Sequence, residues 1–109
     1  MSGGPTLSTH VLDIERGVAA AGVPVGLLQA GRELAQATTD ADGRIGELAS
    51  LDTGEYVLTF DVAAYFQAQG RPAPFLRRVS VEFQAHASDR HYHVPLLLSP
   101  FAVTCYRGS

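Results

Sequence analysis

The segment Glu55-Tyr56-Val57-Leu58-Thr59-Phe60-Asp61 alternates polar and apolar side chains, which is typical of a β-strand with one buried face. A turn signal, Asp52-Thr53-Gly54, comes directly before it. Similar segments recur between turn signals spaced roughly eight to twelve residues apart, as in an all-β sandwich. The further strands that we expect cover residues 7–13, 23–29, 33–38, 44–48, 77–86, 91–98 and 101–106.

One segment, residues 62–69, departs from this alternation and predicts a short helix. Asp61 can cap its first turn, and Gly70 with Pro72 would stop it. The strands expected at 77–86 and 91–98 are separated by Ala87-Ser88-Asp89, a spacing that suggests a hairpin. The 109 residues fit a single domain, residues 1–109, in which we expect residues 1–5 to be disordered.

Composition narrows the classes of function. Hydrophobic residues make up 46% of the chain and charged residues 17%, and a subunit interface is the ordinary use of such surplus apolar surface. The net charge is −3 and the basic residues form no stripe, so we expect no nucleic-acid partner. The single Cys105 excludes an intrachain disulfide. With no apolar run near the roughly 20 residues of a membrane helix and no visible signal peptide, we expect no membrane partner and a cytoplasmic location.

Histidines occupy strand positions where apolar residues are more usual. His10 alternates in phase with Ser8, so both side chains leave one face of the first strand. His91 and His93 likewise share a face of a later strand. A strand histidine is more often a surface or hydrogen-bonded residue than a catalyst, and for His86 and His91 this ordinary interpretation is favoured.

Two further chemistries are weighed on spacing alone. His91 and His93 could supply two metal ligands, and with His10 they would resemble a catalytic zinc site with an open position. No cysteine or carboxylate pair strengthens that interpretation. Ser99 precedes Pro100 without the sharp strand-to-helix turn of a serine nucleophile, so serine hydrolase chemistry is weaker still.

Arg44 and the C-terminal residues are the remaining polar candidates. Arg44 follows the strong turn Thr39-Asp40-Ala41-Asp42-Gly43, where a charge is usually solvated. At the other end of the chain a strand-like segment leads into Tyr106-Arg107-Gly108-Ser109. This tetrapeptide offers a guanidinium, a hydroxyl and a terminal carboxylate, although a loose tail is the simpler interpretation when it is taken alone.

Together these segments resemble those of the transthyretin-related 5-hydroxyisourate hydrolase family. The matching segments are Leu7-Ser8-Thr9-His10-Val11-Leu12-Asp13 with Arg16-Gly17, Thr39-Asp40-Ala41-Asp42-Gly43-Arg44, His91-Tyr92-His93-Val94-Pro95-Leu96-Leu97-Leu98-Ser99-Pro100-Phe101, and Tyr106-Arg107-Gly108-Ser109. They run from about Leu7 to Ser109 in the family's order, and the terminal tetrapeptide is specific to the hydrolases. Hormone-carrying transthyretins have a Lys, a Glu and a Thr in place of His10, Arg44 and His93.

The resemblance implies a fold, an assembly and an activity. The implied fold is an all-β, transthyretin-like, eight-stranded Greek-key β-sandwich with one short helix. The implied assembly is a homotetramer, a dimer of dimers, with active sites at the ends of an inter-dimer channel. The implied activity is hydrolysis of 5-hydroxyisourate, the product of urate oxidation, to 2-oxo-4-hydroxy-4-carboxy-5-ureidoimidazoline, without a metal or organic cofactor.

The resemblance also assigns roles to individual residues. The expected catalytic residues are His10, Arg44 and His93, and the expected substrate-binding residues are Tyr106, Arg107 and Ser109. A histidine suits a general base near neutral pH, so either His10 or His93 would activate the water while the other orients it or protonates the leaving nitrogen. Arg44 would stabilise the developing oxyanion through its fixed donors.

Two residues near the C-terminus depart from the family pattern. Val103 replaces an aromatic residue and Cys105 replaces a threonine, and both changes alter the packing expected of the last strand near the inter-dimer surface. Two other classes of function stay open beside the hydrolase. One is a non-catalytic small-ligand binder of the transthyretin type, and the other is a structural β-sandwich module of a larger assembly.

Overall fold

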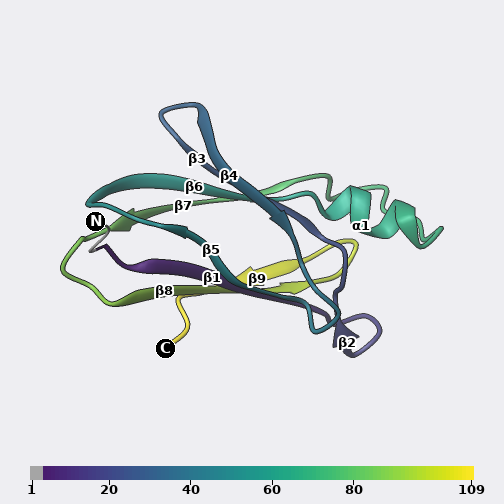
Figure 1. The fold of residues 1–109 in the computed structure, drawn as a ribbon. Coiled ribbons are helices and arrows are strands. Elements are labelled where there is room, and N and C mark those ends of the chain that lie inside the picture. Colours follow the sequence, from purple (N-terminus) through teal and green to yellow (C-terminus); the bar gives the residue numbers. More distant parts are fainter. Residues whose placement is uncertain (1–3) are drawn as a thin grey trace.

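The computed structural model describes residues 4–109, which form two β-sheets and one helix (Figure 1). The strands are β1 (Thr6–Asp13), β2 (Val18–Ala19), β3 (Pro24–Gln29), β4 (Arg32–Thr38), β5 (Arg44–Ser50), β6 (Gly54–Phe60), β7 (Val79–Ala85), β8 (His91–Leu98) and β9 (Val103–Cys105), and the helix is α1 (Val62–Ala68). The predicted all-β sandwich with one short helix is confirmed. The two-residue β2 comes in addition to the eight expected strands.

The two sheets form the two layers of the sandwich (Figure 1). One sheet has the order β2-β1-β8-β9, with β5 also paired to β1, and the other has the order β4-β3-β6-β7. All pairs are antiparallel except β1 with β8, which run parallel. This parallel pair brings the start of the chain beside its last long strand, and the candidate site is built on it.

The core lies between the sheets and is filled by alternate residues of each strand. Leu7 and Val11 of β1, Leu27 of β3, Leu58 of β6 and Leu96 of β8 are all fully buried. Burying one such side chain stabilises the fold by about 1.5–3 kcal/mol. Since successive strand residues point to opposite faces, the residues in the opposite phase, such as Ser8 and His10 of β1, lie on the outer face of their sheet.

Helix α1 confirms the predicted helix and ends one residue earlier. A carboxylate oxygen of Asp61 accepts a hydrogen bond from the Ala64 amide at 3.0 Å, which satisfies a donor of the first turn. The chain leaves the helix through Gly70, whose φ of 66° suits glycine. Tyr65 and Phe66 anchor the helix because both rings are buried.

The hairpin predicted between residues 77–86 and 91–98 is wrong. Strand β7 pairs with β6 and β8 pairs with β1 and β9, so the connection crosses from one sheet to the other. Hydrogen bonds made by side chains stabilise this connection between the two sheets. The Tyr92 hydroxyl accepts from the His86 amide at 2.9 Å and donates to the Asp89 carboxylate, while the Thr53 hydroxyl accepts from the Ala87 amide.

The ends of the predicted elements also shift. The last strand was expected at 101–106 but covers only Val103–Cys105, because Ser99 and Ala102 close a turn in which Ala102 O accepts from the Ser99 amide at 3.0 Å. The disorder expected over residues 1–5 falls on residues 1–3, outside the described residues, and on Gly4 and Pro5. Pro5 is buried, and its carbonyl accepts from the Leu51 amide at 2.7 Å. Along residues 4–109, no helix is long and apolar enough to cross a membrane.

Candidate active site

Three segments that are distant in sequence meet on the outer face of the β1–β8 sheet. In the parallel β1–β8 register Ser8 lies opposite His93, two residues after the pair Thr6 and His91. On the other side of β1, the antiparallel register with β5 places His10 opposite Arg44. The alternation that buries Leu7 and Val11 therefore gathers histidines and an arginine on the face away from the core.

Arg44 is positioned by the turn that precedes it. One Asp40 carboxylate oxygen accepts from the amides of Asp42 and Arg44, both at 2.9 Å. Gly43 has a φ of 74°, and a Cβ there would lie 2.4 Å from Val11 O, so only glycine fits this close approach. The turn also fixes His10, whose Nε2 lies 3.0 Å from Asp42 O. A carbonyl only accepts hydrogen bonds, so Nε2 of His10 carries a proton.

His93 is half-buried and is held on both its backbone and its ring. Its carbonyl accepts from the Gly108 amide at 2.7 Å, and its Nδ1 lies 2.7 Å from Ser8 Oγ. Among residues 4–109, Nε2 of His93 has no hydrogen-bond partner. Burial lowers the pKa of His93 below 6.5, and the electrostatic influence of His91, His10 and Arg44 lowers it further. The imidazole is therefore neutral near pH 7.

Ser8, Thr6 and His91 are part of this arrangement, although sequence reasoning gave Ser8 and Thr6 no functional role and considered His91 only as a possible metal ligand. Ser8 is only 7% exposed, and its hydroxyl bridges His93 Nδ1 and His91 Nε2, the latter at 2.8 Å. The other ring nitrogen of His91 lies 2.7 Å from Thr6 Oγ1. The available signals were the shared strand phase of Ser8 with His10 and of His91 with His93.

An open cavity of about 280 Å³ lies over these side chains, and we call it the histidine cavity. Its lining residues are Ser8, Thr9, Arg44, Ile45, Gly46, His91, His93 and Ser109. Of the six residues expected in the site, Arg44, His93 and Ser109 line this cavity, and His10 lies beside Arg44 in the β1–β5 register. The cavity thus combines a neutral imidazole, a permanent cation and the end of the C-terminal segment.

Tyr106 and Arg107 lie elsewhere. Both line a separate, more apolar hollow with Cys105, between β7 and β8. The Arg107 guanidinium donates to His91 O at 3.2 Å and lies over the Tyr92 ring, 4.3 Å from its centroid. In Figure 1 the C-terminal segment leaves β9 and passes along β8 on the side away from β6 and β7. The start of this segment, Tyr106 and Arg107, therefore lines the apolar hollow, whereas its last residue, Ser109, lines the histidine cavity.

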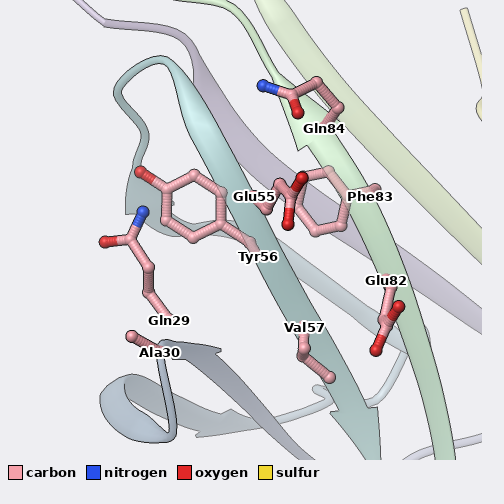
Figure 2. A pocket seen from close by; sticks show the side chains of 8 residues that line it. All are labelled: Gln29, Ala30, Glu55, Tyr56, Val57, Glu82, Phe83 and Gln84. Atoms are coloured by element: carbon pink, nitrogen blue, oxygen red, sulfur yellow. The ribbon is translucent and has the colours of Figure 1, made fainter.

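The chain also has a larger hollow, of about 360 Å³, on the other sheet (Figure 2). Side chains of β6, β7, the end of β3 and the turn after it line this hollow, including Glu55, Glu82, Tyr56 and Gln29. Its lining contains neither a histidine nor a cation. Because general base chemistry near neutral pH needs a group that titrates there, the smaller histidine cavity is the stronger candidate despite its size.

A family description fits this chain over almost its whole length. The model of the HIUase/Transthyretin family matches residues 7–108. The chain belongs to this family. One relative, the 5-hydroxyisourate hydrolase of Deinococcus radiodurans, is 44% identical over 119 residues, covering 100% of both chains.

Solved structures of the HIUase/Transthyretin family share the fold but carry different names. A Klebsiella pneumoniae 5-hydroxyisourate hydrolase has a TM-score of 0.89 at 40% identity, covering 96% of this chain and 99% of its own. A sea bream transthyretin in complex with thyroxine has a TM-score of 0.87 at 34% identity, covering 94% of both chains. The fold alone does not separate the two names, so function has to be argued from the side chains of the site.

The hydrogen bonds of the histidine ring nitrogens give little support to a zinc site in this chain. Both ring nitrogens of His91 contact hydroxyls and Nε2 of His10 faces a carbonyl, whereas among residues 4–109 Nε2 of His93 and Nδ1 of His10 have no hydrogen-bond partner. Within residues 4–109, no three His, Cys, Asp or Glu side chains are grouped so that they could hold a metal ion. The geometry suits hydrogen bonding and proton transfer better than metal binding.

Proposed function

We propose that this chain hydrolyses 5-hydroxyisourate to 2-oxo-4-hydroxy-4-carboxy-5-ureidoimidazoline in urate degradation. The observation that carries the proposal is the His93 imidazole, kept neutral with a free Nε2, in one open cavity with Arg44. The relatives named 5-hydroxyisourate hydrolase, at 40–44% identity over nearly full length, support the same reaction. The chain is accordingly a hydrolase that acts on a cyclic amide.

His93 is the general base of this proposal. Its Nε2 takes a proton from water as the water oxygen attacks a ring carbonyl, and Arg44 stabilises the charge that develops on the carbonyl oxygen. The C–N bond then breaks, and the leaving nitrogen takes the proton back. His10 donates through Nε2 to Asp42 O, and this bond holds the turn that precedes Arg44 in place. In this proposal His10 also orients the water. No metal or organic cofactor enters these steps.

The C-terminal residues complete the proposed site. Ser109 would contact the substrate from the cavity wall, while Arg107, through His91 O, holds the segment that carries Ser109. Tyr106 faces another hollow of this chain, so its proposed substrate contact depends on assembly. We propose a homotetramer, a dimer of dimers, in which a second dimer closes the open side of the cavity. A cytoplasmic location is part of the proposal, to be tested by fractionation.

The decisive experiment is ultraviolet monitoring of freshly generated 5-hydroxyisourate with and without the protein. We expect accelerated decay, and we expect His93→Ala to lose most of the turnover while keeping the parent's thermal unfolding and oligomeric state. His86→Ala is the matched control, because His86 is exposed and outside the cavity. An active His93→Ala that needs added zinc would overturn the proposal in favour of a metal site.

A second candidate is a small-ligand carrier, which the similarity to thyroxine-bound sea bream transthyretin favours. Decay of 5-hydroxyisourate at the uncatalysed rate, together with saturable binding of thyroxine, would support the carrier and exclude the hydrolase. Accelerated decay that is lost in His93→Ala would exclude a purely binding role.

A further inference from the structure

Four side chains on the outer face form one continuous row of hydrogen bonds. Thr6 Oγ1 lies 2.7 Å from His91 Nδ1, His91 Nε2 lies 2.8 Å from Ser8 Oγ, and Ser8 Oγ lies 2.7 Å from His93 Nδ1. All three distances are those of well-formed hydrogen bonds. We call this row the hydroxyl–imidazole chain. It begins at the half-exposed Thr6 and ends at the ring of His93, which lines the histidine cavity.

Every member of this chain can both donate and accept a proton. A hydroxyl has one donor and two acceptor sites, and a neutral imidazole has one of each. Among residues 4–109, no backbone group makes a hydrogen bond to the side-chain atoms that these three bonds join, so none fixes their direction. Other polar side chains nearby are fixed, since Thr9 Oγ1 donates to Val94 O at 2.6 Å and His10 faces Asp42 O. The chain can therefore run in either of two directions.

The two directions give His93 opposite chemical properties. When His93 Nδ1 donates to Ser8, its Nε2 holds a free lone pair and can act as a base. When Ser8 donates to His93 Nδ1 instead, Nε2 carries a proton and can act as an acid. Reversal of the chain thus converts the base of the first step into the acid of the second.

We propose that Ser8 and His91 are positioning residues of the hydrolysis, and that the hydroxyl–imidazole chain relays the proton which His93 takes up. As water attacks, its proton goes to His93 Nε2, the Nδ1 proton goes to Ser8 Oγ, and the Ser8 proton goes to His91 Nε2. His91 then carries the positive charge. When the C–N bond breaks, the same protons return in reverse and His93 Nε2 delivers one to the leaving nitrogen. This inference rests on the proposed function.

The electrostatics of the site favour a positive charge on His91 over one on His93. A positive charge on His93 is opposed by burial and by His91, His10 and Arg44, which together lower its pKa. His91 is exposed at the start of β8, where water solvates a charge. Its carbonyl binds Arg107, which also lies 3.7 Å from Asp89. Moving the charge from His93 to His91 takes it away from Arg44 and into solvent.

The distance between the two imidazole rings explains why the Ser8 hydroxyl is needed between them. Ser8 is 7% exposed, and the two imidazole rings lie nearly parallel, 16° apart, with centroids separated by 6.4 Å. Neither ring nitrogen can reach the other ring directly at a hydrogen-bond distance. Removal of the Ser8 hydroxyl therefore interrupts the chain, because neither ring can span the gap by itself.

The test compares Ser8→Ala, Ser8→Thr and His91→Phe with two matched controls outside the chain, Ser80→Ala and His86→Phe, both at exposed positions. General acid–base catalysis contributes roughly 10²–10⁴-fold, and loss of the relay alone should lower kcat by roughly tenfold with little change in KM. Ser8→Thr keeps the hydroxyl and should restore most of kcat. The double variant Ser8→Ala/His91→Phe should be no slower than either single variant, because both interrupt one chain.

Two readouts distinguish a relay from a merely structural role. In mixtures of H₂O and D₂O, the parent's kcat should curve with deuterium fraction, as expected when several protons move together, and Ser8→Ala should give a straight line. Without substrate, nitrogen NMR of His93 should show both tautomers in the parent and a changed ratio in Ser8→Ala. A linear parent plot, or a kcat and a tautomer ratio unchanged in Ser8→Ala, would overturn the relay. A parent that does not accelerate 5-hydroxyisourate decay would overturn the proposed function instead, and the NMR result would still decide the hydrogen-bond chain.

Discussion

Gly108→Ala is the substitution that most directly tests the placement of His93. Gly108 pairs with His93 through an isolated β-bridge, and its amide donates to His93 O at 2.7 Å. A Cβ on residue 108 would lie 2.7 Å from Cδ2 of the His93 ring and 3.3 Å from Cγ of Pro95. The backbone of Gly108 is not in the left-handed region, so the added methyl group acts through this contact alone.

The short contact between the added Cβ and the His93 ring determines how far kcat should fall. Ordinary van der Waals contacts of a Cβ lie at 3.4–4 Å, so the ring or the C-terminal segment has to move by at least 0.7 Å, the difference between 3.4 and 2.7 Å. Pro95 blocks one side, and the hydrogen bond between Ser8 Oγ and Nδ1 holds the ring. A misplacement of about 1 Å at a catalytic group can cost roughly 100-fold in rate. We expect kcat to fall by roughly that factor.

The assay is the decay of 5-hydroxyisourate at saturating substrate, with thermal unfolding measured on the same samples. Unfolding should change little, because the contact lies on the outer face and not in the core. Gly46→Ala is the control: it adds a methyl group in the same cavity but meets no atom within 4 Å, so it should change KM more than kcat. A Gly108→Ala protein with the parent's kcat would refute the view that His93 must stay where the structure places it.

Two further predictions concern charge. Asp13→Asn should lower the free energy of unfolding by about 3 kcal/mol in urea titrations, with the specific activity of the folded protein retained, because it removes the buried one of the two carboxylates that pair with Arg71. Fully buried Asp13 accepts from Arg71 at 2.6 Å and from Tyr65 at 2.8 Å. Burial raises the pKa of Asp13, but these hydrogen bonds outweigh burial and lower the pKa below 3.8. In the parent, the stabilisation by the Asp13 carboxylate should therefore fade as the pH falls below 3.8. The acid unfolding curve of the variant should lack this loss. The acid limb of kcat/KM should lie below pH 6.5, since the pKa of His93 is lowered. Arg44→Gln removes one of the positive charges that lower it, so NMR titration should show a higher His93 pKa in that variant; an unchanged value would mean that Arg44 does not act on His93.

Strand positions were predictable because alternation is a local property. The segment 55–61 and strand β6 (Gly54–Phe60) agree within one residue at either end, and the helix after Asp61 was recognisable from its cap. Pairing is not local in this sense. The distance in sequence between 77–86 and 91–98 is that of a hairpin, yet side chains of Tyr92 and Asp89 direct the connection to the other sheet.

The contacts within the site were likewise not predictable from local sequence patterns. His10, Arg44 and His93 were identified by resemblance, but nothing in the sequence placed Ser8 between two histidines. That contact joins residues 85 positions apart and depends on β1 and β8 being parallel neighbours. The separation of Ser109 from Tyr106 likewise depends on the bridge that Gly108 makes with His93. Motif spacing describes which residues occur together, whereas strand register decides which of them touch.

The placement of the site on the outer face explains how one fold can carry two kinds of function. On β1 and β8 the inward residues Leu7, Val11 and Leu96 are fully buried, while the intervening outward positions carry the histidines. A strand repeats every two residues, so an outward side chain can change without repacking the core. Substitutions on this face should therefore alter catalysis with small effects on stability. That separation is consistent with a hydrolase and a thyroxine-bound transthyretin that match this chain almost equally well in fold, with TM-scores of 0.89 and 0.87.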